Sequence, residues 1–367
     1  MPAEVTRPVR RELFRAAGTP DSEAVLEQSL DPLRVGLGER RLRVAENAVL
    51  VPNAGILDRD GNTLPDGQFR RFPSHTVIAG EERIEPIEPE VELSGEAVYL
   101  GWFGAHFGHF LIETMARWWA VRHVDVAIPL IWQSSPPFLT SRFAHRRVSG
   151  FGFDQARISL VEQPMRVQRL ILPDVTFEER YYIHEDAAIP FHEIGEQLGG
   201  FPDLTDQPLY LSRGNIKFPG RVVENEVRFE EYLTGQGWRV VRPDALPIPE
   251  QIALVRSHRV IAGHIGTALH LTMFSAHRPI VHALTYNTNA LPNYALWADA
   301  LGTPFSSFNC AAVNTTGDPA LKNVLSFDLA KAAGYLHAEG LVASPRVPGF
   351  DDAESAPAPD APPAGAA

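Results

Sequence analysis

One group of residues in this chain combines types and spacings that suit a phosphorylated ligand. An apolar strand runs into Gly263, His264, Gly266 and Thr267, a glycine-flanked turn that opens an apolar helix. A helix that starts in this way directs backbone N–H groups and the positive end of its dipole toward one point. Thr267 stands where a first-turn hydroxyl could contact a phosphate. The alternative is a tight turn that only packs the helix on its sheet.

An arginine follows the preceding strand and could supply a forked contact to the same anion. Residues 209–212 read as a buried strand, and Arg213 comes directly after it. A guanidinium matches phosphate oxygens in a bidentate manner. Lys217 and Arg221 follow in a loop, so three cations lie close together in an acidic chain, which favours an anion site. A surface ion pair would also explain Arg213 taken alone.

Two polar residues open the helix expected after this loop. Asn225 as the N-cap and Glu226 in the first turn are a normal helix start, and this capping role explains both without any ligand. Contact with a ribose or a base is the alternative.

A histidine and a carboxylate form the second chemical group. His109 and Glu113 are four residues apart, so on a helix they share a face within hydrogen-bonding reach. A carboxylate that orients a histidine can make it a general base. Two ligands are too few for a metal site, so no metal is expected. The alternative is a buried histidine satisfied by its neighbour. For His264 and His270 the pattern favours a core or capping role over catalysis.

The elements that position these residues alternate between strands and helices, which indicates an α/β fold with parallel sheets. We expect a β-rich N-terminal attachment at 1–95, one Rossmann-like domain at 96–200 and a second at 201–340, joined near residues 199–203. Residues 343–367 are rich in Pro, Ala and Asp and are expected to be a disordered tail. The helices expected to matter most span 22–30, 108–122, 138–150, 189–198, 225–235, 249–257 and 267–275.

Composition limits the partners. The chain has 367 residues, 44% of them hydrophobic, and a formal net charge of -12, which argues against general binding to nucleic acid. Cys310 is the sole cysteine, so no intrachain disulfide is expected. No signal peptide and no membrane-spanning run is recognised. We expect a cytoplasmic protein and leave open a peripheral position at the inner face of the membrane. The sequence predicts no oligomeric state.

Taken in order, these motifs resemble glycosyltransferase family 61, whose bacterial members are often called capsular polysaccharide biosynthesis proteins. The resemblance spans roughly residues 95–285. The residues that carry it are Gly108-His109-Phe110-x-x-Glu113, Leu211-Ser212-Arg213, Arg221, Asn225-Glu226, Gln251 and the stretch from Gly263 to Phe274.

The resemblance implies a GT-B architecture, in which two Rossmann-like domains face each other across a cleft. It implies an inverting, metal-independent transfer from a nucleotide sugar to a hydroxyl of a surface polysaccharide, a related glycan or its lipid-linked precursor, with no cofactor. His109 would be the base, oriented by Glu113. Binding of the nucleotide sugar would fall to the residues of the C-terminal half, namely Arg213, Arg221, Asn225, Glu226, Gln251, Gly263, His264, Gly266, Thr267 and His270.

Two positions depart from the family pattern and define the competing hypotheses. Glu113 stands where an aspartate is common, and Ile265 replaces a histidine before the second glycine, with His264 one residue earlier. One alternative is transfer or hydrolysis of another phosphorylated donor on the same scaffold. The other is a catalytically silent subunit of a polysaccharide assembly system that binds a sugar nucleotide or a glycan.

Overall fold

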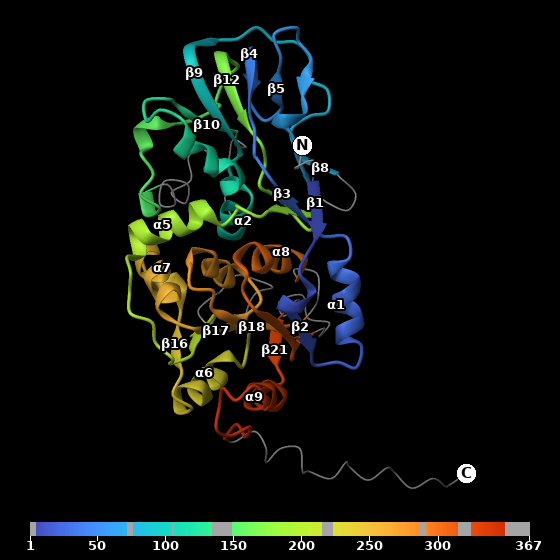
Figure 1. Cartoon of the computed structure of the whole chain (residues 1–367), viewed down its shortest axis with the longest axis vertical. Coiled ribbons are helices and arrows are strands. Elements are labelled where there is room, and N and C mark those ends of the chain that lie inside the picture. Colours follow the sequence, from blue (N-terminus) through green and yellow to red (C-terminus); the bar gives the residue numbers. More distant parts are fainter. Residues whose placement is uncertain are drawn as a thin grey trace, which may run out of the picture.

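The computed structural model describes residues 5–71, 76–104, 106–133, 149–214, 223–286, 291–314 and 324–348. It is an α/β protein, as expected, with two large sheets stacked along the long axis and helices between them (Figure 1). Most of the expected helix at 138–150, the loop cations Lys217 and Arg221 and most of the expected tail lie outside the described residues.

The upper sheet in Figure 1 has the strand order β11-β10-β9-β12-β4-β5-β6. Its strands are β4 (Leu42–Val51), β5 (Gly55–Leu57), β6 (Thr63–Leu64), β9 (Val91–Trp102), β10 (Leu130–Gln133), β11 (Ile158–Leu160) and β12 (Met165–Pro173). The pairs from β11 to β12 are parallel, and those from β12 to β6 are antiparallel. The sheet is therefore mixed, whereas the sequence analysis expected a parallel one.

The lower sheet is parallel throughout and has the order β16-β15-β17-β18-β19-β2. Its strands are β2 (Phe14–Ala17), β15 (Leu209–Leu211), β16 (Arg239–Val241), β17 (Val260–His264), β18 (Ile280–Thr285) and β19 (Phe305–Asn309). Among the last five strands along the chain the order is 2-1-3-4-5, a doubly wound pattern that reverses direction between β15 and β17. Ligands of such sheets bind at the carboxyl ends of the strands, where this reversal occurs.

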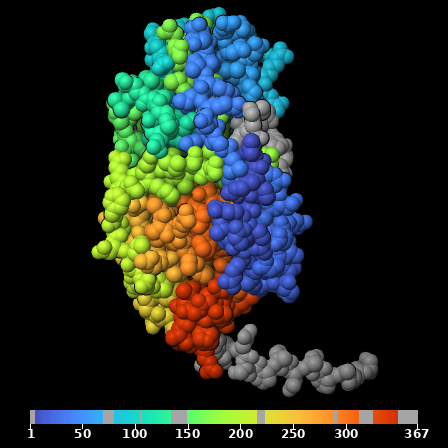
Figure 2. All heavy atoms as spheres, viewed as in Figure 1, coloured from blue at the N-terminus to red at the C-terminus, as the bar shows by residue number. Residues whose placement is uncertain are grey.

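Residues 1–95 are rich in strands, as expected, but they do not form a separate attachment. Besides β2 and β4 to β6, they supply β1 (Val5–Pro8) and β3 (Arg34–Leu37), which join β13 (Phe177–Glu178) and β14 (Tyr182–His184) in a third sheet. Figure 2 shows the first part of this segment, in dark blue, against the side of the lower half, and the part that follows, in lighter blue, in the upper half. Alternate residues of β4, such as Leu50, enter the same core as Tyr99 of β9, so burial of apolar side chains explains their pairing.

The remaining described elements flank these sheets. They are α1 (Ser22–Leu30), which agrees with the expected helix, α5 (Ile189–Gly199), α6 (Glu226–Gly235), α7 (Ile248–Ser257), α8 (Leu291–Leu301), α9 (Leu329–Ala338), the strand pairs β7 (Phe69–Arg71) with β8 (Thr76–Ala79) and β20 (Ala311–Asn314) with β21 (Val324–Phe327), and the 3-10 turns η1 (Arg11–Leu13), η2 (Pro65–Gly67), η4 (Gln155–Arg157) and η5 (Pro243–Ala245).

Two expected helices differ from the prediction. The one at 108–122 is a short α-helix, α2 (Phe107–Ile112), followed by a 3-10 helix, η3 (Thr114–His123). The carbonyl of Ala116 accepts hydrogen bonds from the amide and the hydroxyl of Thr176, which replace an α-helical partner. The helix after the glycine turn is also of 3-10 type, η6 (Thr267–Phe274).

One hydrophobic core runs through both halves of the molecule. A row of aromatic rings crosses the boundary: Phe110 lies 5.4 Å from Phe151, which lies 5.7 Å from Phe274, and Phe274 lies 5.4 Å from Phe191. Helix α5, which carries Phe191, packs on both α7 and η6. This shared core fixes the upper half against the lower half.

We expect Phe274→Ala to lower the free energy of unfolding by about 3–5 kcal/mol, because Phe274 is fully buried in this row and its loss leaves a cavity. Urea denaturation followed by tryptophan fluorescence measures the change. Phe201→Ala is the matched control, since that ring is 80% exposed and its loss should cost less than about 1 kcal/mol. Equal losses in the two variants would contradict the shared core.

Candidate functional site

The two sequence motifs of the lower half meet where the doubly wound sheet reverses direction. Arg213 follows β15, and the turn from His264 to Gly266 follows β17. Leu211 pairs with Gly263 in the parallel register, so the two strand ends lie side by side. The expected proximity of the arginine to the glycine turn is thus present.

The side chain of Arg213 is buried and fixed rather than exposed at an edge. Its Nη1 atom donates to His264 Nδ1 at 2.7 Å and to the carbonyl of Ile265 at 3.1 Å. A Cβ atom at position 266 would lie only 3.1 Å from the same nitrogen. Gly266 therefore allows the guanidinium to lie directly against the turn, and a larger residue there would displace it.

His264 is neutral, and its imidazole contacts the guanidinium of Arg213. A guanidinium only donates hydrogen bonds, and His264 Nδ1 also lies 2.8 Å from the carbonyl oxygen of Ile265. Burial, followed by the nearby charge of Arg213, lowers the pKa of His264 to about 3. The ring stacks on Tyr286 at 5.4 Å and is fully buried. These contacts give His264 a supporting role behind the guanidinium.

Glu226 supports the arginine from the backbone side. One carboxylate oxygen, Oε1, accepts from the hydroxyl of Tyr210 at 2.9 Å and from the backbone N–H of Arg213 at 3.0 Å. The side chain is completely buried, and this burial raises the pKa of Glu226. The side chain thus fixes the residue that follows β15, a third role beside the two that the sequence analysis weighed.

Three other residues from the expected binding set have structural contacts. Asn225 makes no side-chain cap; its amide instead bridges the backbone of Phe327, with bonds of 2.7 and 2.8 Å. Gln251 is buried and donates to the carbonyl of Leu246 at 2.8 Å. A Cβ atom on Gly263 would lie 3.0 Å from the carbonyl of Leu211, so that glycine permits close packing of β17 on β15.

The expected base lies at the end of α2 that faces the glycine turn. His109 Nδ1 and Glu113 Oε2 are 3.0 Å apart, as their spacing predicts. A Cβ atom on Gly108 would lie 3.1 Å from the hydroxyl oxygen of Thr267. The start of α2 in the upper half therefore packs against the start of η6 in the lower half, and His109 is the residue that follows Gly108.

A third titratable group near His109 escaped the sequence analysis. One nitrogen of His109 and one oxygen each of Glu113 and Glu179 all lie within 4.8 Å of one another. Glu179 comes from the turn between β13 and β14 and is buried. Such a set could in principle hold a cation, which the argument from the His109–Glu113 pair alone did not consider. No spacing along the sequence signals this approach.

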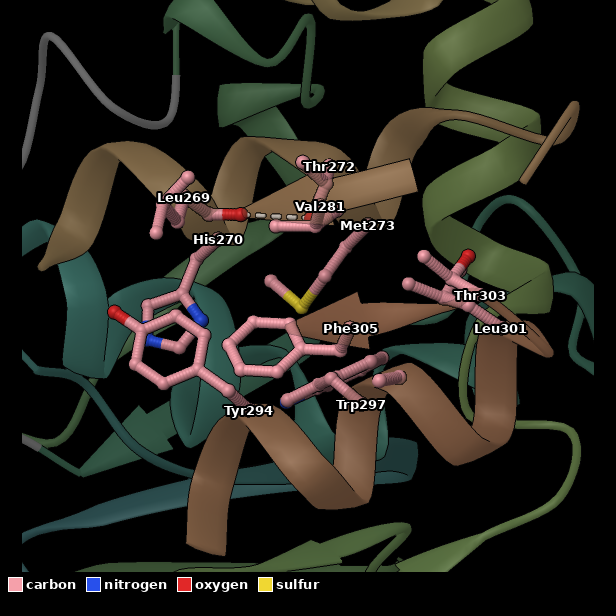
Figure 3. Close-up of a pocket in the computed structure, with 11 residues that line it drawn as sticks. Leu269, His270, Thr272, Met273, Val281, Tyr294, Trp297, Leu301, Thr303 and Phe305 are labelled. Carbon is pink, nitrogen blue, oxygen red and sulfur yellow. Dashed lines mark hydrogen bonds between the residues drawn. The ribbon is translucent and has the colours of Figure 1, made fainter. Parts of the chain in front are cut away.

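His270 belongs to η6 and neighbours His109 and His106. Its ring stacks in parallel on Tyr294 with centroids 4.5 Å apart, and Figure 3 shows one ring lying over the other. Burial, followed by the neighbouring His109 and His106, lowers the pKa of His270 to about 3. The cavity beside these rings measures about 10 Å³, which is near the lower limit for a single water molecule, so it is no ligand pocket.

We expect His270→Phe to change how stability depends on pH. An unfolded histidine takes up a proton below about pH 6.5, whereas the folded imidazole stays neutral to about pH 3. In the wild type this difference lowers the free energy of unfolding by up to about 1.4 kcal/mol for each pH unit of acidification through that window. The ring of the variant can still stack. Its free energy of unfolding should therefore rise relative to that of the wild type between pH 6 and pH 4.5.

Urea denaturation at a series of pH values measures both proteins, and the comparison at pH 7.5 serves as the internal control for altered packing. A difference between the two proteins that stays constant from pH 7.5 to 4.5 would mean that the imidazole protonates freely in the folded state.

One comparison with known proteins identifies a similar family. Residues 107–281 match the family model described as Glycosyltransferase 61. A search of curated proteins finds no match. In the described part of the chain, no helix has the length and apolar character needed to cross a bilayer. The matched region begins at α2, which carries His109, and includes the arginine and the glycine turn. Over this matched stretch the chain is similar to glycosyltransferase family 61.

Proposed function

We propose that this protein is an inverting, metal-independent glycosyltransferase that moves a sugar from a nucleotide-sugar donor to a hydroxyl of a surface polysaccharide or related glycan. The observation that carries the proposal is the contact between Gly108 and Thr267, which brings a candidate base and a candidate phosphate site together from the two halves. The family match over both motifs supports the glycosyl transfer itself.

The donor side of the proposed site is the region 201–340. As the bond to the sugar breaks, negative charge develops on the leaving diphosphate and must be stabilised. Arg213, the N–H groups at the start of η6 and the hydroxyl of Thr267 are the groups suited to this task. Because the contacts with His264 and Glu226 already hold Arg213 in place, little reorganisation is needed during the reaction.

The acceptor side is the region 96–200. His109 takes the proton from the acceptor hydroxyl while Glu113 orients the imidazole and stabilises its charged form. The acceptor oxygen attacks the anomeric carbon opposite the departing diphosphate, which inverts the configuration. No cofactor enters this scheme, and an arginine with a helix start supplies the positive charge that other enzymes take from a metal.

The arrangement proposed for the whole protein is that of GT-B enzymes, with the acceptor a surface glycan or a lipid-linked precursor on the cytoplasmic side of the membrane. A catalytically silent binding subunit is the competing proposal. It draws on Ile265, which replaces the family histidine, and on the burial of both His264 and His270. Hydrolysis of the donor in the absence of an acceptor would favour the enzyme.

We expect Arg213→Ala to abolish donor binding and to lower transfer at least about 100-fold, since it removes the positive charge facing the leaving group. Thermal-shift assays with UDP, GDP, CMP, TDP and their common sugar conjugates, each with and without EDTA, measure binding through stabilisation of the folded state. The matched control is Arg259→Ala, an arginine that precedes β17 and pairs with exposed Asp206 at the opposite end of the strand.

Arg259→Ala should retain the shift and the activity. Transfer that is unchanged in Arg213→Ala would refute the donor site, and activity that EDTA abolishes would refute the metal-independent mechanism. A wild-type protein that responds to none of the nucleotides would favour the silent subunit.

We expect His109→Gln to lower kcat about 100-fold to 10,000-fold while the thermal shift produced by the donor is retained, because a general base acts on the acceptor and not on the donor. Radiolabelled transfer to an acceptor glycan measures kcat. A variant that transfers sugar at the wild-type rate would remove His109 from the mechanism.

A further inference from the structure

The turn at Glu179 and Arg180 forms a wall of the proposed active centre. It connects β13 with β14 and brings a Glu179 oxygen within 4.8 Å of both His109 and Glu113. The Glu179 side chain is only 8% exposed, so its position depends on the protein around it rather than on solvent. What holds this carboxylate beside the imidazole is therefore a question of packing, hydrogen bonds and its ion pair with Arg180, whose Nε lies 3.7 Å from Glu179 Oε1.

The backbone of Arg180 is in an unfavourable conformation. Its φ is +62°, a left-handed value that is rare for residues other than glycine and asparagine. Such residues persist where neighbouring groups hold them, and they gather at functional sites. Here the N–H of Arg180 donates to Asn293 Oδ1 at 2.7 Å.

The other end of the same amide reaches the carboxylate. Asn293 Nδ2 donates to Glu179 Oε1 at 3.4 Å, and the side chain of Asn293 is buried. Asn293 belongs to α8, which packs between the third sheet and the lower sheet. One amide thus uses both its donor and its acceptor to fix the backbone and the side chain of this turn.

The next residue of α8 reaches the donor side. The hydroxyl of Tyr294 donates to the carbonyl of Gly266 at 2.6 Å, and its ring stacks on His270. Two consecutive residues of one helix therefore contact the two sides of the proposed site separately. This separation allows their roles to be told apart by experiment.

We propose that Asn293 is a positioning residue that holds Glu179 against His109, so that Glu179 is the second carboxylate of the catalytic base. The inference rests on the proposed function, in which His109 accepts the proton of the acceptor hydroxyl. At that moment the imidazole becomes positively charged, and two fixed carboxylates stabilise it better than Glu113 alone. The proton stays on His109 until it passes to the departing product or to solvent.

The experiment compares Asn293→Ala, Asn293→Asp and Glu179→Gln with the wild type. Asn293→Ala loses both bonds, whereas Asn293→Asp keeps the acceptor for the N–H of Arg180 and sets a carboxylate against Glu179. We expect each of the three variants to lower kcat about 10-fold to 100-fold. The two Asn293 variants displace Glu179, and displacement of a catalytic group by about 1 Å costs up to about 100-fold, whereas Glu179→Gln removes the negative charge itself. The KM for the donor should stay within about twofold of the wild type.

Tyr294→Phe is the matched contrast on the same helix. It removes the bond to Gly266 and keeps the ring stack, so it should raise the donor KM and leave kcat nearly unchanged. Gln207→Glu controls for the change of charge, because Gln207 is an exposed amide bonded to the carbonyl of Gly237. It should match the wild type in both constants. Asn293→Asp kinetics that equal those of Gln207→Glu would overturn the proposal.

A double variant separates positioning from a purely structural role. Combining Glu179→Gln with Asn293→Asp exchanges the amide and the carboxylate, so their hydrogen bond can form again. We expect the double variant to recover the melting temperature of the wild type but not its kcat, because the second carboxylate has moved away from His109. Recovery of both would show that Glu179 acts only through stability and would overturn the proposal.

Hydrogen exchange at the backbone amide of Arg180 tests the contact without any activity. Exchange should be faster in Asn293→Ala than in the wild type and close to the wild type in Asn293→Asp. Unchanged exchange in Asn293→Ala would overturn the proposal even if the enzyme is active. A wild-type protein that transfers no sugar would instead refute the proposed function, whatever the exchange shows.

Discussion

The centre of this molecule is arranged around one buried positive charge, the guanidinium of Arg213. A guanidinium removed from water is costly unless fixed acceptors surround it. Arg213 has such surroundings: a neutral imidazole and a backbone carbonyl contact Nη1, and Glu226 holds its backbone N–H. These groups come from β17 and α6, so the lower sheet must form before the arginine can be held. The glycine at 266 follows from the same constraint, because the guanidinium occupies the space of a side chain.

The other half of the site depends on how the two sheets are joined. The base candidate comes from the upper half and the anion site from the lower half, so neither half contains the whole centre. A continuous core, with Phe151 and Phe274 in contact across the boundary, holds them at a fixed distance. Helix α8 adds hydrogen bonds to both sides. Precision at the site is therefore a property of the interface rather than of either sheet.

Local sequence patterns could predict much of the lower half. The carboxyl ends of neighbouring parallel strands must lie together, so Arg213 and the glycine turn could be paired from their places after two strands. The i, i+4 spacing of His109 and Glu113 likewise predicts that their side chains lie within hydrogen-bonding reach. The proximity of Glu179 and Asn293 could not be predicted, because it depends on how β13, β14 and α8, which are far apart in the sequence, pack together. The same reason hides the true roles of Glu226 and Asn225, whose partners are set by tertiary contacts rather than by helix capping.

The pairing of β2 with β19 has a consequence for the making of this protein. β2 is the first strand of the lower sheet to be synthesised, yet its partner strand, Phe305–Asn309, is synthesised only after every other strand of that sheet. Until then β2 has no partner strand, and an unpaired strand invites pairing with other chains. Completion of the lower sheet must therefore wait until residues 305–309 have been synthesised. Separate expression of the two halves would leave that sheet without its last strand.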